Sequence, residues 1–155
     1  MIRAATPADA PAIMAIWNAA IRDTTVTFSP LEKTADEVIA LTATACLVAE
    51  EGGQAIAFAR YFQFRSGPGY AHTAEHTILV QPSATGRGIG RSLMDVLCDH
   101  ARDAGFHSTV AAVSAENAAG IAFHAACGFR KVACLPEVGF KFGRWIDLVL
   151  MQKRL

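Results

Sequence analysis

Three alternating glycines mark the stretch of the chain whose spacing most clearly indicates chemistry. The stretch from Val80 to Ser92 reads V-Q-P-S-A-T-G-R-G-I-G-R-S, and its glycines are Gly86, Gly88 and Gly90. An apolar, β-branched run precedes it and a helical pattern follows it. A glycine turn that leads from a strand into a helix lets backbone N–H groups converge on an anion, and the helix N-terminus contributes about half a positive charge. The stretch therefore predicts an anion-binding turn.

The spacing of these glycines excludes two common nucleotide-binding patterns. The dinucleotide fingerprint G-x-G-x-x-G fails because its third glycine would fall on Arg91 or Leu93. The phosphate loop G-x-x-x-x-G-K-[ST] fails because Arg91 stands five residues after Gly86. A purely structural turn is the alternative. Three glycines weaken both a strand and a helix, however, which favours a bound anion with Arg87 and Arg91 beside it.

The segment from His72 to His76 matches the zinc-binding pattern H-x-x-E-H, but its context argues against a metal. That pattern needs a helix, whereas a β-branched run follows the segment here. Two strand residues four apart lie about 13 Å from each other, too far to share an ion through bonds of about 2.1 Å. On such a strand Glu75 points away from His76. Glu75 is therefore a candidate general base, with a solvated glutamate at a strand edge as the alternative.

Asn117 and His124 form a second candidate pair. They are seven residues apart in a predicted helix, so they lie on one stripe about 10.5 Å apart. Taken alone, this spacing also fits a helix N-cap at Asn117 and a buried core histidine at His124. Both interpretations stay open on the residues themselves.

The hydrophobic pattern predicts a mixed β-sheet flanked by helices, of the α/β class, in the order β-α-α-β-β-β-α-β-α-β-β. Glu75 and the glycine turn belong to one strand–turn–helix unit, so the same strand positions both. The predicted strands are residues 2–5, 46–50, 55–64, 73–80, 109–113, 129–134 and 145–152, with a hairpin turn at 51–53 and a connector at 136–141. The predicted helices begin at Thr6 and at about Thr34, run from the glycine turn to Gly105, and span Asn117 to Cys127.

Composition limits the classes of function. With 155 residues, 52% of them hydrophobic, the chain is expected to form a single domain with a buried core. Its 14 basic and 14 acidic residues cancel, which argues against binding to nucleic acid or to a membrane surface. The chain opens without a signal-peptide pattern, and its apolar runs fall short of the roughly 20 residues of a membrane span. The four cysteines (Cys46, Cys98, Cys127 and Cys134) lack C-x-x-C spacing and are expected to be buried free thiols in the cytoplasm.

The glycine turn resembles the acetyl-CoA pyrophosphate loop of the GCN5-related N-acetyltransferases, which has the pattern [QR]-x-x-G-x-[GA]. The leading Gln or Arg of that pattern is Thr85 here. Three further segments resemble the phosphinothricin and methionine sulfone acetyltransferase branch of that family. They are Thr73 to Thr77, Glu116 to His124, and Gly139 to Asp147. The resemblance covers nearly the whole chain.

This resemblance implies a central twisted mixed sheet flanked by helices, acetyl-CoA as co-substrate, and no metal. The implied cofactor-binding residues are Ile78, Leu79, Val80, Gly86, Arg87, Gly88, Ile89, Gly90, Arg91 and Asn117, the last beside the pantetheine arm. The strand is expected to bulge at Ile78 to Val80 and to part from its neighbour there. The implied substrate-binding residues are Phe28, Arg65, Tyr70, Glu75, His76, Thr77 and Lys141.

The resemblance further implies that the α-amino group of a small amino-acid analogue, such as phosphinothricin, methionine sulfone or methionine sulfoximine, is acetylated by direct transfer through a tetrahedral intermediate. Glu75 would take the amine proton, directly or through a water, and a backbone N–H of residues 78–80 would stabilise the oxyanion. His124 would relay a proton or orient a water. Arg65 would pair with a carboxylate or phosphinate, although Gly67 stands where the family often has a second Arg.

Two other functions stay open on the sequence. The same scaffold could acetylate a protein N-terminus or another small amine, or the chain could be a non-catalytic CoA-binding module. Arg65 and Glu75 favour a small acidic substrate, and the presence of both Glu75 and His124 argues against a non-catalytic module. The resemblance also implies a homodimer formed through the late strands, with the apolar segment from Trp145 to Met151 as the candidate interface.

Overall fold

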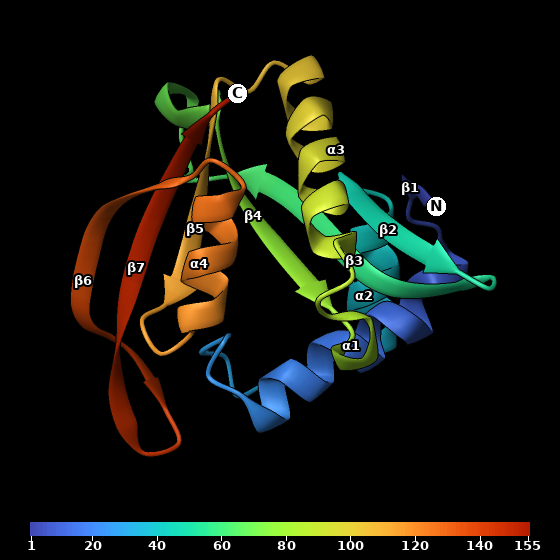
Figure 1. Cartoon of the computed structure of the whole chain (residues 1–155), viewed down its shortest axis with the longest axis horizontal. Helices are drawn as coiled ribbons and strands as arrows, with labels where there is room; N and C mark the ends of the chain where they lie inside the picture. The colour runs from blue at the N-terminus through green and yellow to red at the C-terminus, as the bar shows by residue number, and fades with distance from the viewer.

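The computed structural model describes all 155 residues and contains one seven-stranded mixed sheet (Figure 1). The strand order is β1-β2-β3-β4-β5-β7-β6, and every neighbouring pair is antiparallel except β4 and β5, which are parallel. The strands are β1 (Ile2–Ala4), β2 (Cys46–Glu51), β3 (Gln54–Gln63), β4 (Thr73–Val80), β5 (Ser108–Ser114), β6 (Arg130–Lys141) and β7 (Arg144–Arg154). The predicted fold class and order of elements are confirmed.

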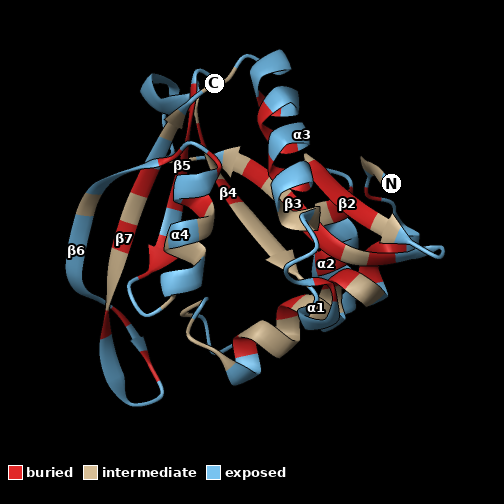
Figure 2. Cartoon of the chain, in the orientation of Figure 1, coloured by how far each residue is buried: buried red, intermediate tan, exposed pale blue.

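Helices cover both faces of the sheet. They are α1 (Ala10–Asp23) and α2 (Ala35–Thr42) on one face, and α3 (Ile89–Asp103) and α4 (Ala118–Ala126) on the other, with 3-10 turns at Pro7–Asp9, Pro68–Tyr70 and Pro82–Ala84. The apolar stripe of α3, with Leu93 and Leu97, packs on the inward residues of β2 and β3, while Ile13 and Trp17 of α1 pack on the opposite face. Figure 2 shows these buried residues gathered between the helices and the central strands. No helix is both long and apolar enough to cross a membrane.

The central feature of the sheet is the parting of β4 from β5. The two strands pair only from Thr73 to Glu75 on β4, opposite Ser108 to Val110 on β5. Beyond that point β4 continues along β3 as far as Val80, and β5 continues along β7 as far as Ser114. The sheet therefore opens into a wedge between β4 and β5, while each of these two strands stays fully paired with its other neighbour.

The C-terminal hairpin differs from its prediction. Residues 136–141, predicted as a connector, belong to β6, which runs on to Lys141 and turns at Phe142 and Gly143. Pro136 has no N–H to donate, so it ends many strands, but β6 is the edge strand and its pairing with β7 shifts register between Leu135 and Gly139. The irregularity absorbs Pro136 without ending the strand.

The environment of one cysteine was also predicted wrongly. All four cysteines are free thiols, and Cys46, Cys98 and Cys127 are buried, but Cys134 is exposed. Cys134 lies on β6, and an edge strand that no helix covers leaves its side chains in solvent.

The start of α1 is fixed to β1 by one carboxylate. The Asp9 carboxylate accepts hydrogen bonds from both terminal nitrogens of Arg3, at 2.8 and 2.9 Å, and from the Thr6 N–H at 2.8 Å. The bonds from the Arg3 guanidinium lower the pKa of Asp9 from 3.8 to about 2. Because the folded pKa is below the ordinary one, the stabilisation is complete above about pH 4 and is lost as the pH falls toward the folded pKa.

We expect Asp9→Asn to lower the free energy of unfolding by about 2 kcal/mol near neutral pH, because the amide cannot replace the charge-assisted bonds to Arg3. The difference from the wild type should shrink strongly at about pH 2.5, where the native carboxylate also takes up a proton. Urea unfolding at the two pH values measures both quantities. An equal loss at both would contradict the assigned role of the Asp9 charge.

Candidate active site

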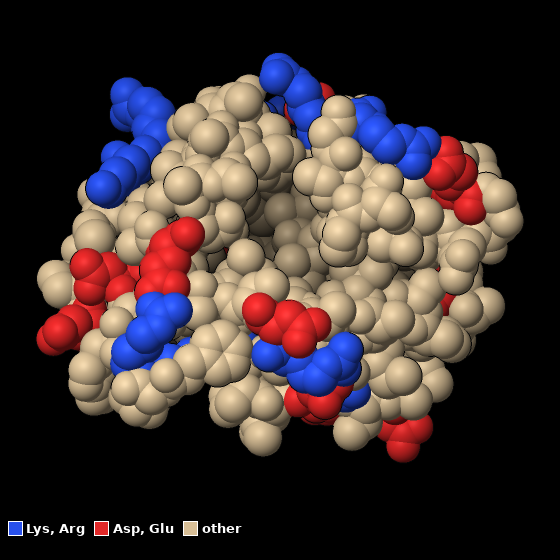
Figure 3. All heavy atoms as spheres, turned by 60° about the horizontal axis from the view of Figure 1, so that its bottom comes forward, with Lys and Arg blue, Asp and Glu red and all other residues tan.

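A cleft of about 370 Å³ occupies the wedge between β4 and β5. Its walls come from both strands, from α1 and α4, and from the loop that follows α1. The lining residues are Trp17, Val26, Thr27, Phe28, Glu75, His76, Thr77, Ile78, Leu79, Ala111, Ala112, Val113, Ser114, Asn117, His124 and Leu148. Figure 3 shows the hollow opening on this side of the molecule, surrounded mainly by uncharged residues, with the Lys, Arg, Asp and Glu side chains farther from it. The cleft thus combines residues from both faces of the sheet.

The backbone of β4 offers unpaired donors to this cleft. The Gln81 N–H donates to the Ile56 carbonyl and the Phe64 N–H donates to the Thr73 carbonyl, both at 2.9 Å, so the odd-numbered residues of β4 direct their backbone groups toward β3. The N–H groups of Ile78 and Val80 therefore face the wedge, where β5 has already departed. The predicted oxyanion donors are thereby reduced to Ile78 and Val80, because the Leu79 N–H faces β3.

The predicted bulge in this part of β4 is wrong. The register between β3 and β4 runs without a shift from Gln63 opposite Ala74 to Ala57 opposite Val80. The opening arises because β5 leaves β4 to pair with β7, not because β4 itself is distorted.

Glu75 lies at the closed end of the wedge, on the face that carries α1 and α2. Its side chain is half-buried and makes no hydrogen bond or ion pair with any other residue. Burial raises the pKa of Glu75, and the positive charge of Arg60 acts against that rise. A carboxylate that is partly desolvated, unpaired and inside a cleft is more basic than an exposed one and is free to accept a proton.

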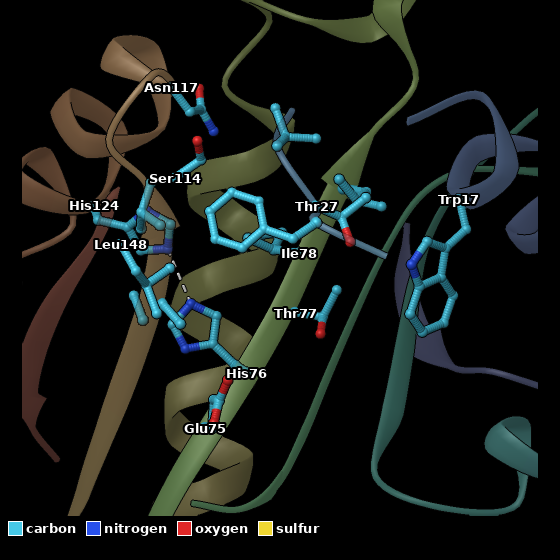
Figure 4. Close-up of a pocket in the computed structure, with 16 residues that line it drawn as sticks. Trp17, Thr27, Glu75, His76, Thr77, Ile78, Ser114, Asn117, His124 and Leu148 are labelled. Carbon is cyan, nitrogen blue, oxygen red and sulfur yellow. Dashed lines mark hydrogen bonds between the residues drawn. The ribbon is translucent and has the colours of Figure 1, made fainter. Parts of the chain in front are cut away.

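His76 and His124 form a buried pair on the opposite face. The Nε2 atoms of the two rings are 3.0 Å apart, as the dashed line in Figure 4 marks. His124 Nδ1 lies 2.7 Å from the Gly120 carbonyl oxygen, and His76 Nδ1 lies 3.1 Å from Thr109 Oγ1. Burial lowers the pKa of each imidazole, and the charge of His124 would lower that of His76 further, so both rings are neutral at pH 7.

These contacts determine which nitrogen of each neutral ring carries its proton. His124 Nδ1 must donate, since the Gly120 carbonyl can only accept, so His124 Nε2 is an acceptor. His76 Nε2 then donates to it, and His76 Nδ1 accepts from the Thr109 hydroxyl. His76, predicted to contact substrate, also holds the His124 ring in one orientation.

Asn117 is the N-cap of α4, as one of the two sequence interpretations predicted. Its Oδ1 accepts from the Gly120 N–H at 2.9 Å. The same side chain lines the cleft, so the cap leaves it accessible to a ligand. Gly120 is therefore tied to Asn117 through its N–H and to His124 through its carbonyl oxygen.

The glycine turn lies just beyond the open end of β4. Gly86 and Gly88 both have φ of +79°, a conformation that favours glycine, and Gly88 is the N-cap of α3. The first N–H groups of α3, at Ile89, Gly90 and Arg91, have no partner within the helix and remain free for an anion. Of the two predicted helper arginines, Arg87 pairs with the exposed Glu51 at 2.6 Å.

Three of the predicted substrate residues, Arg65, Tyr70 and Lys141, do not line the cleft. Arg65 and Tyr70 are exposed in the segment before β4, at the opposite end of that strand from the glycine turn. The Arg65 guanidinium lies 5.3 Å from the centre of the Tyr70 ring. Phe28 and Thr77, in contrast, line the cleft as predicted.

Lys141 contacts the cleft wall from behind. It is buried, and its Nζ donates to the carbonyl oxygens of Thr24 and Thr27 at 2.6 and 2.8 Å. Beside it, a Cβ on Gly139 would come within 2.4 Å of the Phe28 ring. Lys141 and Gly139 together fix the loop that carries Phe28 into the cleft.

No sequence pattern indicates several of the lining residues. The helical spacing predicts Trp17 only as part of a packed helix face, whereas the structure shows that it both packs on Phe58 and lines the cleft (Figure 4). Residues 111–114 of β5 reach the cleft only because that strand diverges from β4, which no local pattern reveals.

Comparison with known proteins gives consistent results. A family model described as the acetyltransferase (GNAT) family matches residues 13–129. The chain is 39% identical to an L-methionine sulfoximine/L-methionine sulfone acetyltransferase of Salmonella typhimurium, over 99% of this chain and 94% of that one. It is 35% identical to a phosphinothricin N-acetyltransferase of Alcaligenes faecalis, over 99% of this chain and 82% of that one.

A solved structure agrees with the fold. The yncA acetyltransferase of Salmonella typhimurium, solved with its cofactor acetyl-CoA, superposes with a TM-score of 0.96 at 38% identity, over 100% of this chain and 93% of that one. With a family model that spans most of the chain and relatives that match its full length, the chain belongs to the acetyltransferase (GNAT) family, as the sequence resemblance implied.

Proposed function

We propose that this protein is an acetyl-CoA-dependent N-acetyltransferase that acetylates the α-amino group of a small amino-acid analogue of the methionine sulfone, methionine sulfoximine or phosphinothricin kind. The observation that carries the proposal is the wedge between β4 and β5. It has unpaired N–H donors on one strand and, at its closed end, a half-buried glutamate without a partner. The names of the relatives support the substrate class.

The residues present fit acetyl-CoA. The free N–H groups of the glycine turn and of the first turn of α3 would hold its pyrophosphate, with the positive φ of Gly86 and Gly88 keeping the backbone accessible. The edge of β4 at Ile78 and Val80, together with Asn117, would hold its pantetheine arm. When bound, acetyl-CoA supplies an acetyl group that is activated as a thioester.

The side chains around the cleft can perform the proton chemistry. Glu75 would accept a proton from the acceptor's ammonium group, directly or through a water, and leave the amine free to attack. The N–H of Ile78 or of Val80 would donate to the carbonyl oxygen on which negative charge develops. The thioester C–S bond would break as the amide forms, and His124, neutral and held by Gly120 and His76, would orient a water or relay a proton to the departing CoA thiolate on the opposite face.

A small acceptor fits better than a protein N-terminus. The cleft of about 370 Å³ is walled on the acceptor side by Phe28 and by the loop that Lys141 fixes. The unpaired carboxylate of Glu75 argues against a non-catalytic CoA-binding module. A half-buried charge without a partner destabilises the fold, and a catalytic role explains why the chain keeps it.

We also propose a homodimer, formed through the C-terminal hairpin rather than through the whole predicted segment from Trp145 to Met151, because Ile146, Val149 and Met151 are buried within the chain. Val138, Phe140, Phe142 and Trp145 are all more than half exposed, and the rings of Phe140 and Trp145 contact each other with centres 4.8 Å apart. An exposed apolar patch of this kind typically marks a protein interface. A cytoplasmic location stays a prediction, supported by the four free thiols.

We expect Glu75→Gln to lower kcat by about a hundredfold or more with little change in acetyl-CoA affinity, because the amide cannot accept the amine proton. Burial raises the pKa of Glu75 above its ordinary value, so wild-type kcat should fall as the pH drops through that raised pKa, and the variant should lack this decrease. A thiol-release assay with methionine sulfone measures kcat, and calorimetry measures acetyl-CoA binding. Glu32→Gln, at an exposed position, is the control, and unchanged turnover in Glu75→Gln would exclude Glu75 as the base.

We expect Lys141→Met to raise the KM for the acceptor by about tenfold while the Kd of acetyl-CoA stays the same, because the variant loses two charge-assisted bonds to the loop that carries Phe28. Lys131→Met, at an exposed lysine of the same strand, should change neither constant. A weaker affinity for acetyl-CoA at unchanged acceptor KM would contradict the proposed role of Lys141.

Light scattering should give the mass of a dimer for the wild type and of a monomer for the double variant Phe140→Glu, Trp145→Glu, because charges on the hairpin oppose burial of its apolar patch. Val96→Glu, at an exposed apolar residue of α3, should remain dimeric. A monomeric wild type would contradict the proposed homodimer.

A further inference from the structure

One arginine beside the cleft has no anionic partner. Arg60 of β3 is half-buried, and its Nε is the one buried side-chain nitrogen or oxygen of the chain that has no hydrogen-bond partner. Arg60 also takes part in none of the ion pairs of the protein. The thiol of Cys46, directly across on β2, offers no compensating charge, because burial raises its pKa to about 11. A buried guanidinium N–H without a hydrogen-bond partner destabilises the fold, and a ligand that accepts from it would remove this cost.

The strand register places this guanidinium next to Glu75. Arg60 is opposite Thr77, and Phe62 is opposite Glu75, so all four side chains project from the same face of the sheet. The Arg60 Cζ lies 4.6 Å from the centre of the Phe62 ring, so the side chain leans toward the level of Glu75. Thr77 and Glu75 both line the cleft, and Arg60 lies directly behind this part of the lining, on the neighbouring strand.

The two charges influence each other without forming a contact. The charge of Arg60 opposes the rise in the pKa of Glu75, and the charge of Glu75 opposes the fall in the pKa of Arg60 that burial causes. Their atoms nevertheless do not come within the 4.0 Å of an ion pair. Each charged group therefore remains destabilised by desolvation, because the charge of the other offsets only part of that cost. A ligand with one positive and one negative charge could stabilise both groups.

We propose that Arg60 binds the carboxylate of the acceptor while Glu75 receives its ammonium group, so that the site selects zwitterionic α-amino acids over amines that lack a carboxylate. A guanidinium can hold a carboxylate through two parallel N–H···O bonds, which also orients the attached amine. This inference rests on the proposed function and identifies a different anion-binding residue from Arg65, which is exposed outside the cleft.

The test compares two acceptors that differ only in the carboxylate, methionine sulfone and 3-(methylsulfonyl)propylamine. Arg60→Ala should raise the KM for methionine sulfone by about ten- to a hundredfold, leave the KM for the amine nearly unchanged, and keep the Kd of acetyl-CoA. Arg60→Lys should raise the KM for methionine sulfone less than Arg60→Ala does, since lysine keeps the positive charge but cannot form the bidentate pair with a carboxylate. Arg102→Ala, at an exposed arginine near the end of α3, is the matched control.

Two kinetic results would overturn the inference. One is an equal loss for both acceptors in Arg60→Ala, and the other is a selective loss in Arg65→Ala with none in Arg60→Ala. Calorimetric titration with methionine sulfone separates this question from the proposed function. If the wild type binds the amino acid and Arg60→Ala does not, the carboxylate site stands even where no turnover occurs; if both bind equally, Arg60 has no such role. A wild type that acetylates no amine and binds no acetyl-CoA would instead refute the proposed function.

Discussion

The site depends on the separation of β4 and β5 in an otherwise continuous sheet. Unpaired strand edges inside a protein are costly, because each buried N–H or C=O without a partner forfeits a hydrogen bond. The cost is tolerated here because β4 is paired with β3, and β5 with β7, along their whole lengths. On the helical side, Gly90 of α3 lies against the Phe123 ring of α4, where even a Cβ would come within 3.3 Å, so the two helices meet across the gap.

The wedge divides the proposed chemistry between the two faces of the sheet. Alternation along β4 sends Glu75 and Thr77 to the face of α1 and α2, and His76 and Ile78 to the face of α3 and α4. In the proposed reaction the amine and its base are on the first face, and the cofactor and the histidine pair are on the second. The amine reaches the acetyl group only through the gap. Because side chains alternate along a strand, β4 places residues on both sides of that gap within a few positions.

Local patterns predicted the elements and the direction of Glu75, because both follow from periodicity and turn chemistry. They could not predict the contact between His76 and His124, which lie 48 positions apart and meet only once α4 packs beside the wedge. Arg65 is the anion-binding candidate of the sequence because it precedes β4 in the chain, yet its side chain is exposed and does not line the cleft. Arg60 gave no signal, since a single arginine in an alternating strand usually points to solvent. Its importance depends on the register of β3 against β4.

The C-terminal hairpin shows how one strand can connect the acceptor site to the outer surface. Gly139 and Lys141 of β6 are buried toward the loop of Phe28, whereas Val138 and Phe140 project outward and are exposed. Glu116 adds a second tie, since it accepts from the Thr25 hydroxyl and forms an ion pair with Arg144 of β7. Because side chains alternate along β6, the exposed apolar residues and the buried residues that hold the Phe28 loop come from the same short segment of the strand.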